Sequence, residues 1–116
     1  MGEKFKNIET AVLHDGYDSK NHNDSLAVPI YQTSTFTFEN AEQGEGRFAG
    51  EVGGHIYSRL GNPTVDVLEK KIATLEGGEA ALAFASGMAA VSAVLLGITK
   101  AGDHVIASQG LYGCTF

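Results

Sequence analysis

The chain has 116 residues, 43% hydrophobic and 19% charged, which predicts a folded domain with a modest core and excludes a disordered chain. Its net charge is −6 and its eight lysines and arginines are scattered, which argues against nucleic acid or an anionic membrane as the main partner. One cysteine permits no internal disulfide and favours a reducing, cytoplasmic location. Residues 1–10 are charged and lack an apolar core, so no secretory signal is expected.

Residues 1–62 are the irregular part of the sequence. They hold few sustained periodic segments and are rich in Asn, Asp, Gly and Ser; a short helix over 41–50 is weakened by Gly44 and Gly46. Such a long, weakly structured segment is unusual inside a compact monomer. We therefore expect residues 1–62 to form an arm that contacts a neighbouring subunit.

The segment 57–64 reads as a polar loop that ends where a helix starts. Asn62 is a favourable N-cap, and Pro63 suits the first helical position because its missing N–H needs no partner there. Arg59 supplies a forked, charged donor and Tyr57 a hydroxyl, so the two are candidates for holding an anion. The alternative is a surface loop with one solvated arginine.

Helices and strands alternate after residue 62. We expect a helix over 63–77, a short buried strand over 80–85, a helix over 87–98 and a strand over 103–108. The apolar face of the first helix consists of Val65, Leu68, Ile72 and Leu75. This order predicts an α/β fold that begins a mostly parallel sheet with flanking helices.

The uncharged stretch 80–99 is long enough to cross a bilayer. The Ser86-Gly87 break in its middle favours a buried strand, a turn and a buried helix instead. One and a half strand–helix units cannot complete a parallel sheet, both faces of which need cover. We therefore expect the chain to be the N-terminal piece of a longer protein, with 63–116 as the start of its larger domain.

The turn Ser86-Gly87-Met88 is a second candidate anion site. It follows the expected strand and opens the expected helix, where Ser86 can cap and Gly87 lets a ligand approach the backbone. The free N–H groups of Gly87 and Met88, with the helix dipole behind them, would favour an anion. The alternative is an ordinary serine cap before a buried helix.

Tyr112 and Cys114 follow the last expected strand, where ligands collect in open α/β sheets. Tyr112 could stack on a planar cofactor and move protons, or simply cover an edge of the core. Cys114 has no histidine near it in sequence, so a weakly polar pocket residue is favoured over a nucleophile. The four histidines show no metal spacing, and no metal is expected.

Four segments, taken together, resemble the Cys/Met-metabolism family of pyridoxal 5'-phosphate (PLP) enzymes, and they occur in order across essentially the whole chain. These segments are residues 28–36 (VPIYQTSTF), 57–64 (YSRLGNPT), 85–88 (ASGM) and 112–115 (YGCT). Within the family, Cys114 and the segments 41–44 (AEQG) and 47–49 (RFA) resemble the methionine γ-lyase group. The resemblance implies the N-terminal part of a fold-type I PLP-dependent transferase, in which an irregular arm precedes a mostly parallel sheet.

The resemblance also implies roles for the two candidate anion sites. Ser86, Gly87 and Met88 would bind the PLP phosphate at the helix N-terminus. Tyr57 and Arg59 would reach across a dimer interface to the phosphate held by the neighbouring subunit. The implied assembly is a homo-oligomer, a dimer of dimers.

The implied chemistry is γ-elimination of L-methionine to methanethiol, 2-oxobutanoate and ammonia, with PLP as the electron sink. Tyr112 would stack on the pyridine ring and act as an acid for the departing γ-thiol. Cys114 would line the substrate pocket and tune its specificity.

The resemblance places the cofactor-linking lysine, the Asp under the pyridine nitrogen and the Arg for the substrate carboxylate beyond Phe116. Lys70, Lys71 and Lys100 do not match the family's lysine motif, so this chain is expected to be inactive by itself. Alternatives are O-acetylhomoserine sulfhydrylase or cystathionine γ-lyase or γ-synthase of the same family. A non-catalytic chain that binds a phosphate or pairs with a partner subunit is the alternative from another class.

Overall fold

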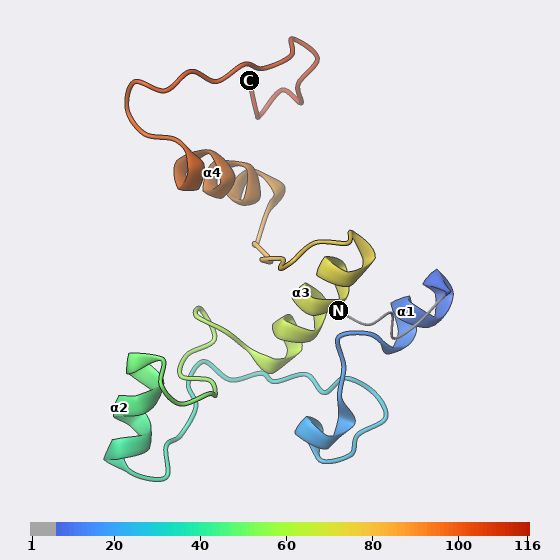
Figure 1. Ribbon diagram of the computed structural model, residues 1–116, viewed down its shortest axis with the longest axis vertical. Helices are drawn as coiled ribbons and strands as arrows, with labels where there is room; N and C mark the ends of the chain where they lie inside the picture. Colours follow the sequence, from blue (N-terminus) through green and yellow to red (C-terminus); the bar gives the residue numbers. More distant parts are fainter. Residues whose placement is uncertain (1–6) are drawn as a thin grey trace. The chain divides into compact units, whose positions relative to one another are not determined.

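The computed structural model describes residues 7–116 as two compact units, the first ending at Ala81 and the second running from Leu82 to Phe116 (Figure 1). The helices are α1 (Ile8–His14), the short 3-10 helix η1 (Ser19–His22), α2 (Ala41–Ala49), α3 (Pro63–Leu75) and α4 (Gly87–Ile98). The first four belong to the first unit and α4 to the second.

Helix α3 has the N-terminus that its sequence predicts. The Asn62 side chain accepts a 2.9 Å hydrogen bond from the Thr64 N–H, and Pro63 occupies the first helical position. The helix ends at Leu75, two residues before the expected end, and the Gly78 N–H donates to the Ala73 carbonyl at 2.8 Å. Local signals at both ends therefore define this helix.

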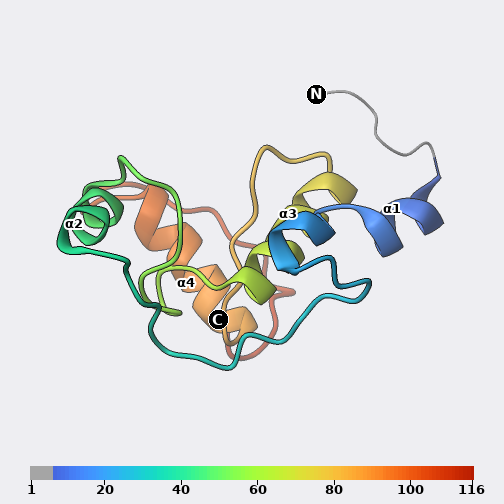
Figure 2. The same cartoon turned by 90° about the horizontal axis from the view of Figure 1, so that it is seen from below.

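Helix α1 packs against α3, as Figure 2 shows. Ala11 on α1 and Val67 and Ala73 on α3 are the buried apolar residues of this small core. The chain then turns at Gly16, which has φ +72° and lies so close to α3 that a Cβ there would meet the Lys71 nitrogen at 2.9 Å. Only glycine allows this approach, because any side chain would clash with the helix backbone.

Helix α2 forms although it contains two glycines, which confirms the helix expected over 41–50. Asn40 caps it by accepting a hydrogen bond from the Gln43 N–H at 2.8 Å, and Gly50 ends it in the left-handed region at φ +74°. The glycines are buried, and a Cβ on Gly46 would lie 2.7 Å from Cγ2 of Val52. Gly46, which weakens the helix by propensity, is therefore the residue that lets Val52 pack on it, while Gly44 leaves room for the Phe38 ring.

The rest of the first unit is extended chain joined by backbone hydrogen bonds. An isolated antiparallel bridge pairs Thr35 with Tyr57. On either side of it, the Phe36 N–H donates to the Ile56 carbonyl and the Ser58 N–H to the Ser34 carbonyl, at 3.0 and 2.9 Å. The segment around residue 35 thus lies directly beside the segment around residue 57.

The expected strands over 80–85 and 103–108 are not present in this structure. Neither segment has regular secondary structure, and Ile106, in the second of them, is 99% exposed. A strand is stabilised by a ladder of hydrogen bonds to a neighbouring strand, and within residues 7–116 neither segment forms such a ladder. The apolar pattern of the two segments was therefore not sufficient to form a sheet.

Helix α4 was predicted correctly, with both ends as expected. It is apolar on all sides and uncharged, yet none of its residues is buried. Within the described part of the chain, no helix combines the length and the apolar character needed to cross a bilayer.

Candidate functional site

Tyr57 and Arg59 lie side by side on an exposed loop of the first unit, residues 57–61. The Arg59 guanidinium carbon is 5.5 Å from the centroid of the Tyr57 ring. Tyr57 is 39% exposed, and Arg59 is exposed as well. A forked cationic donor and a phenol are thus open to the same side, which is the arrangement expected of an anion-binding pair.

Ser58, the residue between them, is held against the rest of the first unit by hydrogen bonds. Its backbone N–H donates to the Ser34 carbonyl at 2.9 Å, and its hydroxyl donates to the Thr33 carbonyl. The Asn62 side-chain amide donates to the Ser58 Oγ at 2.9 Å and to the Tyr31 carbonyl at 3.0 Å. The 57–61 loop is therefore held by the segment 31–34 and by the first residue before α3.

In the second unit, the start of α4 presents unused backbone donors. Ser86 caps the helix: its Oγ accepts from the Ala89 N–H and its carbonyl from the Ala90 N–H, both at 3.1 Å. The N–H groups of Gly87 and Met88 have no acceptor among residues 7–116, as is usual in a first helical turn. A Cβ on Gly87 would have no atom within 4 Å, so a ligand can approach the backbone there.

A turn carrying the other two candidate residues contacts this helix start. The Thr115 N–H donates to the Tyr112 carbonyl at 2.8 Å, which closes the turn. The Thr115 hydroxyl lies 3.3 Å from the Met88 Sδ and donates to it. Tyr112 is 74% exposed and Cys114 carries a free, exposed thiol. Two segments that the sequence predicted separately, 86–88 and 112–114, therefore lie together in the second unit.

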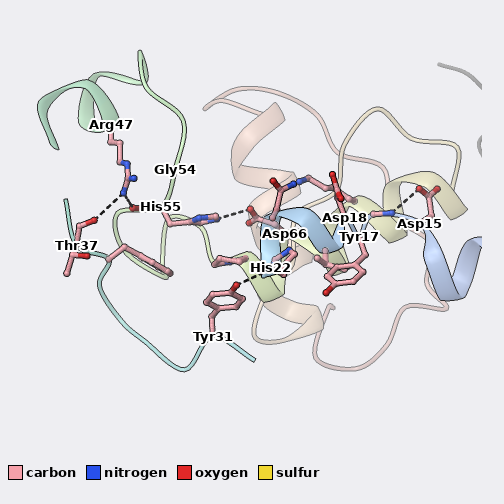
Figure 3. A pocket seen from close by; sticks show the side chains of 16 residues that line it. Asp15, Tyr17, Asp18, His22, Tyr31, Thr37, Arg47, Gly54, His55 and Asp66 are labelled. Atoms are coloured by element: carbon pink, nitrogen blue, oxygen red, sulfur yellow. Dashed lines mark hydrogen bonds and ion pairs between the residues drawn. The ribbon is translucent and has the colours of Figure 1, made fainter. Parts of the chain in front are cut away.

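The sequence interpretation missed a polar cavity of about 690 Å³ in the first unit (Figure 3). His55 Nε2 lies 2.9 Å from the Asp66 Oδ2, and Arg47 Nη1 donates to the His55 carbonyl at 3.1 Å. On the other side, a 3.1 Å hydrogen bond joins the buried His22 Nδ1 to the Tyr31 hydroxyl. These residues come from distant positions with no regular spacing, so no local motif marks them.

None of the candidate residues from the sequence lines this cavity. In the described part of the chain, no group of three or more His, Cys, Asp or Glu side chains could hold a metal ion. Through His55, the cavity residues connect Arg47 on α2 and Asp66 on α3 to the segment just before the 57–61 loop.

Comparison with known proteins identifies the family. The family model described as Cys/Met metabolism PLP-dependent enzyme matches residues 9–116. The chain belongs to this family, which confirms the resemblance that the four sequence segments carried.

Several relatives are named L-methionine gamma-lyase, and two of them show the similarity. The protein from Fusobacterium nucleatum subsp. polymorphum is 57% identical over 116 residues, which are 100% of this chain and 29% of the relative. The protein from Pseudomonas putida is 50% identical over 113 residues, 97% of this chain and 28% of the relative. The chain thus spans less than a third of the length of these curated relatives.

A solved structure shares the fold. A Campylobacter jejuni protein described as an O-acetylhomoserine (thiol)-lyase superposes with a TM-score of 0.87 at 43% sequence identity. The match covers 96% of this chain and 27% of that chain, which carries a pyridoxyl-lysine monophosphate. The chain therefore has the fold of the corresponding part of a PLP-dependent enzyme.

The donors of this chain fit a phosphate monoester. Its negative charge suits the unused N–H groups of Gly87 and Met88 and the positive end of the α4 dipole. Arg59 offers the forked geometry that phosphate oxygens accept.

Proposed function

We propose that the whole protein catalyses PLP-dependent γ-elimination, in which L-methionine and water give methanethiol, 2-oxobutanoate and ammonia. The observation that carries this proposal is the 57% identity, over the complete chain, to a relative named L-methionine gamma-lyase. The 50% identity to a second relative of the same name supports it.

This chain would supply the residues that hold the cofactor phosphate. Ser86 fixes the first turn of α4, while the N–H groups of Gly87 and Met88 donate to phosphate oxygens. Tyr57 and Arg59 donate to the phosphate held by the neighbouring subunit. Their open, adjacent side chains support this role.

Tyr112 and Cys114 would act on the cofactor ring and the substrate, and not on the phosphate. When bound, PLP supplies the electron sink that lets bonds at the α- and β-carbons of the amino acid break. Tyr112 would lie against the cofactor ring, and its hydroxyl would donate a proton to the departing thiolate. Cys114 lines the pocket that receives the substrate sulfur. The contact between Thr115 and Met88 supports this arrangement, because it brings the 112–115 turn to the start of α4.

The whole protein would assemble as a cytoplasmic homo-oligomer, a dimer of dimers. The arm of residues 1–62, of which the structure describes 7–62, would contact the neighbouring subunit, and residues 63–116 would begin a large fold-type I domain. There, segments 80–85 and 103–108 would pair with further strands into a mostly parallel sheet. The uncharged, unburied helix α4 supports this, because a helix that is apolar on all sides is normally covered by other parts of a protein.

A second candidate reaction is γ-replacement by an O-acetylhomoserine sulfhydrylase. The observation in its favour is the solved structure with a TM-score of 0.87, which is described as an O-acetylhomoserine (thiol)-lyase. Both reactions would use the same phosphate-holding residues, so they differ in the substrates they consume and the products they release.

The deciding experiment supplies the whole protein, loaded with PLP, with L-methionine alone or with O-acetylhomoserine plus sulfide. We expect 2-oxobutanoate and methanethiol from methionine alone. Homocysteine from the second mixture, with no 2-oxobutanoate from methionine, would replace the lyase with the sulfhydrylase. The absence of both products would reject both.

A further inference from the structure

Asn62 is a buried polar residue, only 6% exposed, whose side chain makes three hydrogen bonds. Its oxygen accepts from the Thr64 N–H at 2.9 Å and so caps α3. Its nitrogen donates to the Tyr31 carbonyl at 3.0 Å and to the Ser58 Oγ at 2.9 Å. One side chain thus joins helix α3, the segment at residue 31 and the 57–61 loop.

Capping requires only the oxygen. Asn40 offers a comparison within the same chain, because its side-chain oxygen also caps a helix, α2, while the residue itself is exposed. Aspartate and serine cap helices as well as asparagine does. The amide nitrogen of Asn62 therefore does something that capping does not explain.

The amide nitrogen of Asn62 donates to Ser58, which lies between the two candidate phosphate ligands, Tyr57 and Arg59. Ser58 is drawn inward by Asn62, by the Thr33 carbonyl and by its own backbone bond to Ser34. With Ser58 fixed on the inner side, Tyr57 and Arg59 are left together on the outer side.

We propose that Asn62 is a positioning residue for cofactor binding: its amide nitrogen fixes Ser58 and so holds Tyr57 and Arg59 in the orientation that receives a phosphate. The inference rests on the proposed phosphate role of Tyr57 and Arg59. Asn62 itself contacts no phosphate and acts only through the loop. Such preorganisation raises affinity because the loop loses less conformational freedom on binding.

The substitution Asn62→Asp in the whole protein separates the two roles of the side chain. It keeps an oxygen for the cap of α3 and removes the N–H donors to Tyr31 and Ser58. We expect the dissociation constant of PLP, measured by titrating the apoprotein and following the bound cofactor's visible absorbance, to rise about tenfold. Asn40→Asp is the matched control, with the same change of charge at a helix cap, and should leave PLP affinity unchanged.

Ser58→Ala provides a second variant in case Asn62→Asp does not fold. It removes the loop's end of the same hydrogen bond and leaves the cap of α3 intact. We expect it to weaken PLP binding in the same direction. Unchanged PLP affinity in both folded variants would overturn the positioning role.

A double-mutant cycle with Arg59→Ala then tests whether Asn62 acts through the loop. If it does, Asn62→Asp should weaken PLP binding far less in the Arg59→Ala background than in the wild type. Equal losses in both backgrounds would overturn the inference, since a general structural defect is independent of Arg59.

The outcomes also separate this inference from the proposed function. If Arg59→Ala alone leaves PLP affinity unchanged, the phosphate role of the loop fails and the inference falls with it. If Arg59→Ala weakens binding but Asn62→Asp does not, only the positioning role fails.

Discussion

The two candidate halves of the phosphate site are supported very differently. The 57–61 loop is held by hydrogen bonds from Ser58 and Asn62 to three backbone carbonyls and to each other. The start of α4 has its Ser86 cap and a contact between Met88 and Thr115, and it lies in a helix with no buried residue. The chain therefore fixes its candidate side-chain ligands by itself, whereas its candidate backbone ligands depend only on the geometry that any helix start has.

The largest expected effect concerns the side-chain half. Arg59→Ala in the whole protein should weaken PLP binding roughly 100-fold, about 2.7 kcal/mol, because a charge-assisted bidentate contact is lost. Arg59→Lys keeps the charge without the fork and should fall between wild type and Arg59→Ala. Retention of the cofactor on dialysis and its visible absorbance measure both variants. If Arg59→Ala weakened PLP binding no more than Arg59→Lys does, Arg59 would not contact the phosphate.

The second prediction tests how rigidly the first unit supports the loop. A Cβ on Gly46 would lie 2.7 Å from the Val52 side chain, so Gly46→Ala should lower the free energy of unfolding by about 2 kcal/mol. Gly53→Ala is the matched control, because nothing lies within 4 Å of a Cβ there. Urea unfolding of the whole protein compares them. Equal stability of the two variants would show that α2 and the 50–54 segment are loosely packed.

The third prediction concerns the backbone half. Because a Cβ on Gly87 meets no atom of this chain, Gly87→Ala should change the free energy of unfolding by no more than about 0.5 kcal/mol. It should still weaken PLP binding about tenfold, since the methyl group occupies space that the phosphate needs. Titration of the apoprotein with PLP and urea unfolding separate the two quantities. Unchanged affinity would remove Gly87 from the site.

The sequence predicted the elements that carry their own signals. Helices α2, α3 and α4 have an Asn or Ser cap followed by helical periodicity, and all three are present. Helix α1 and η1 were missed, because they are only 7 and 4 residues long and α1 depends on packing against α3. The strands expected over 80–85 and 103–108 are not present in this structure, because a strand forms as part of a sheet and the described residues form no β-ladder at either segment.

The residues of the candidate site were likewise predicted only where a local sequence signal marks them. Tyr57, Arg59 and the 86–88 turn could be identified from local chemistry and from the family resemblance. The hydrogen bonds that hold Ser58 could not be predicted from the sequence. Two of them join it to residues 24 and 25 positions earlier, and the bond from Asn62 follows no local sequence pattern. The sequence did not predict the His55–Asp66 pair for the same reason, because the two side chains come into contact only in the folded chain.

The central claim is that the two halves of one phosphate site come from different subunits. Whole-protein Arg59→Ala and Gly87→Asp variants are unfolded together, refolded as a mixture and assayed at a PLP concentration too low for either variant alone to act on methionine. If the halves meet across subunits, mixed dimers contain one intact site of two, and activity should recover to about a quarter of wild type. If both halves come from the same subunit, every site keeps a defect and the mixture stays as inactive as its parents, which would contradict the account.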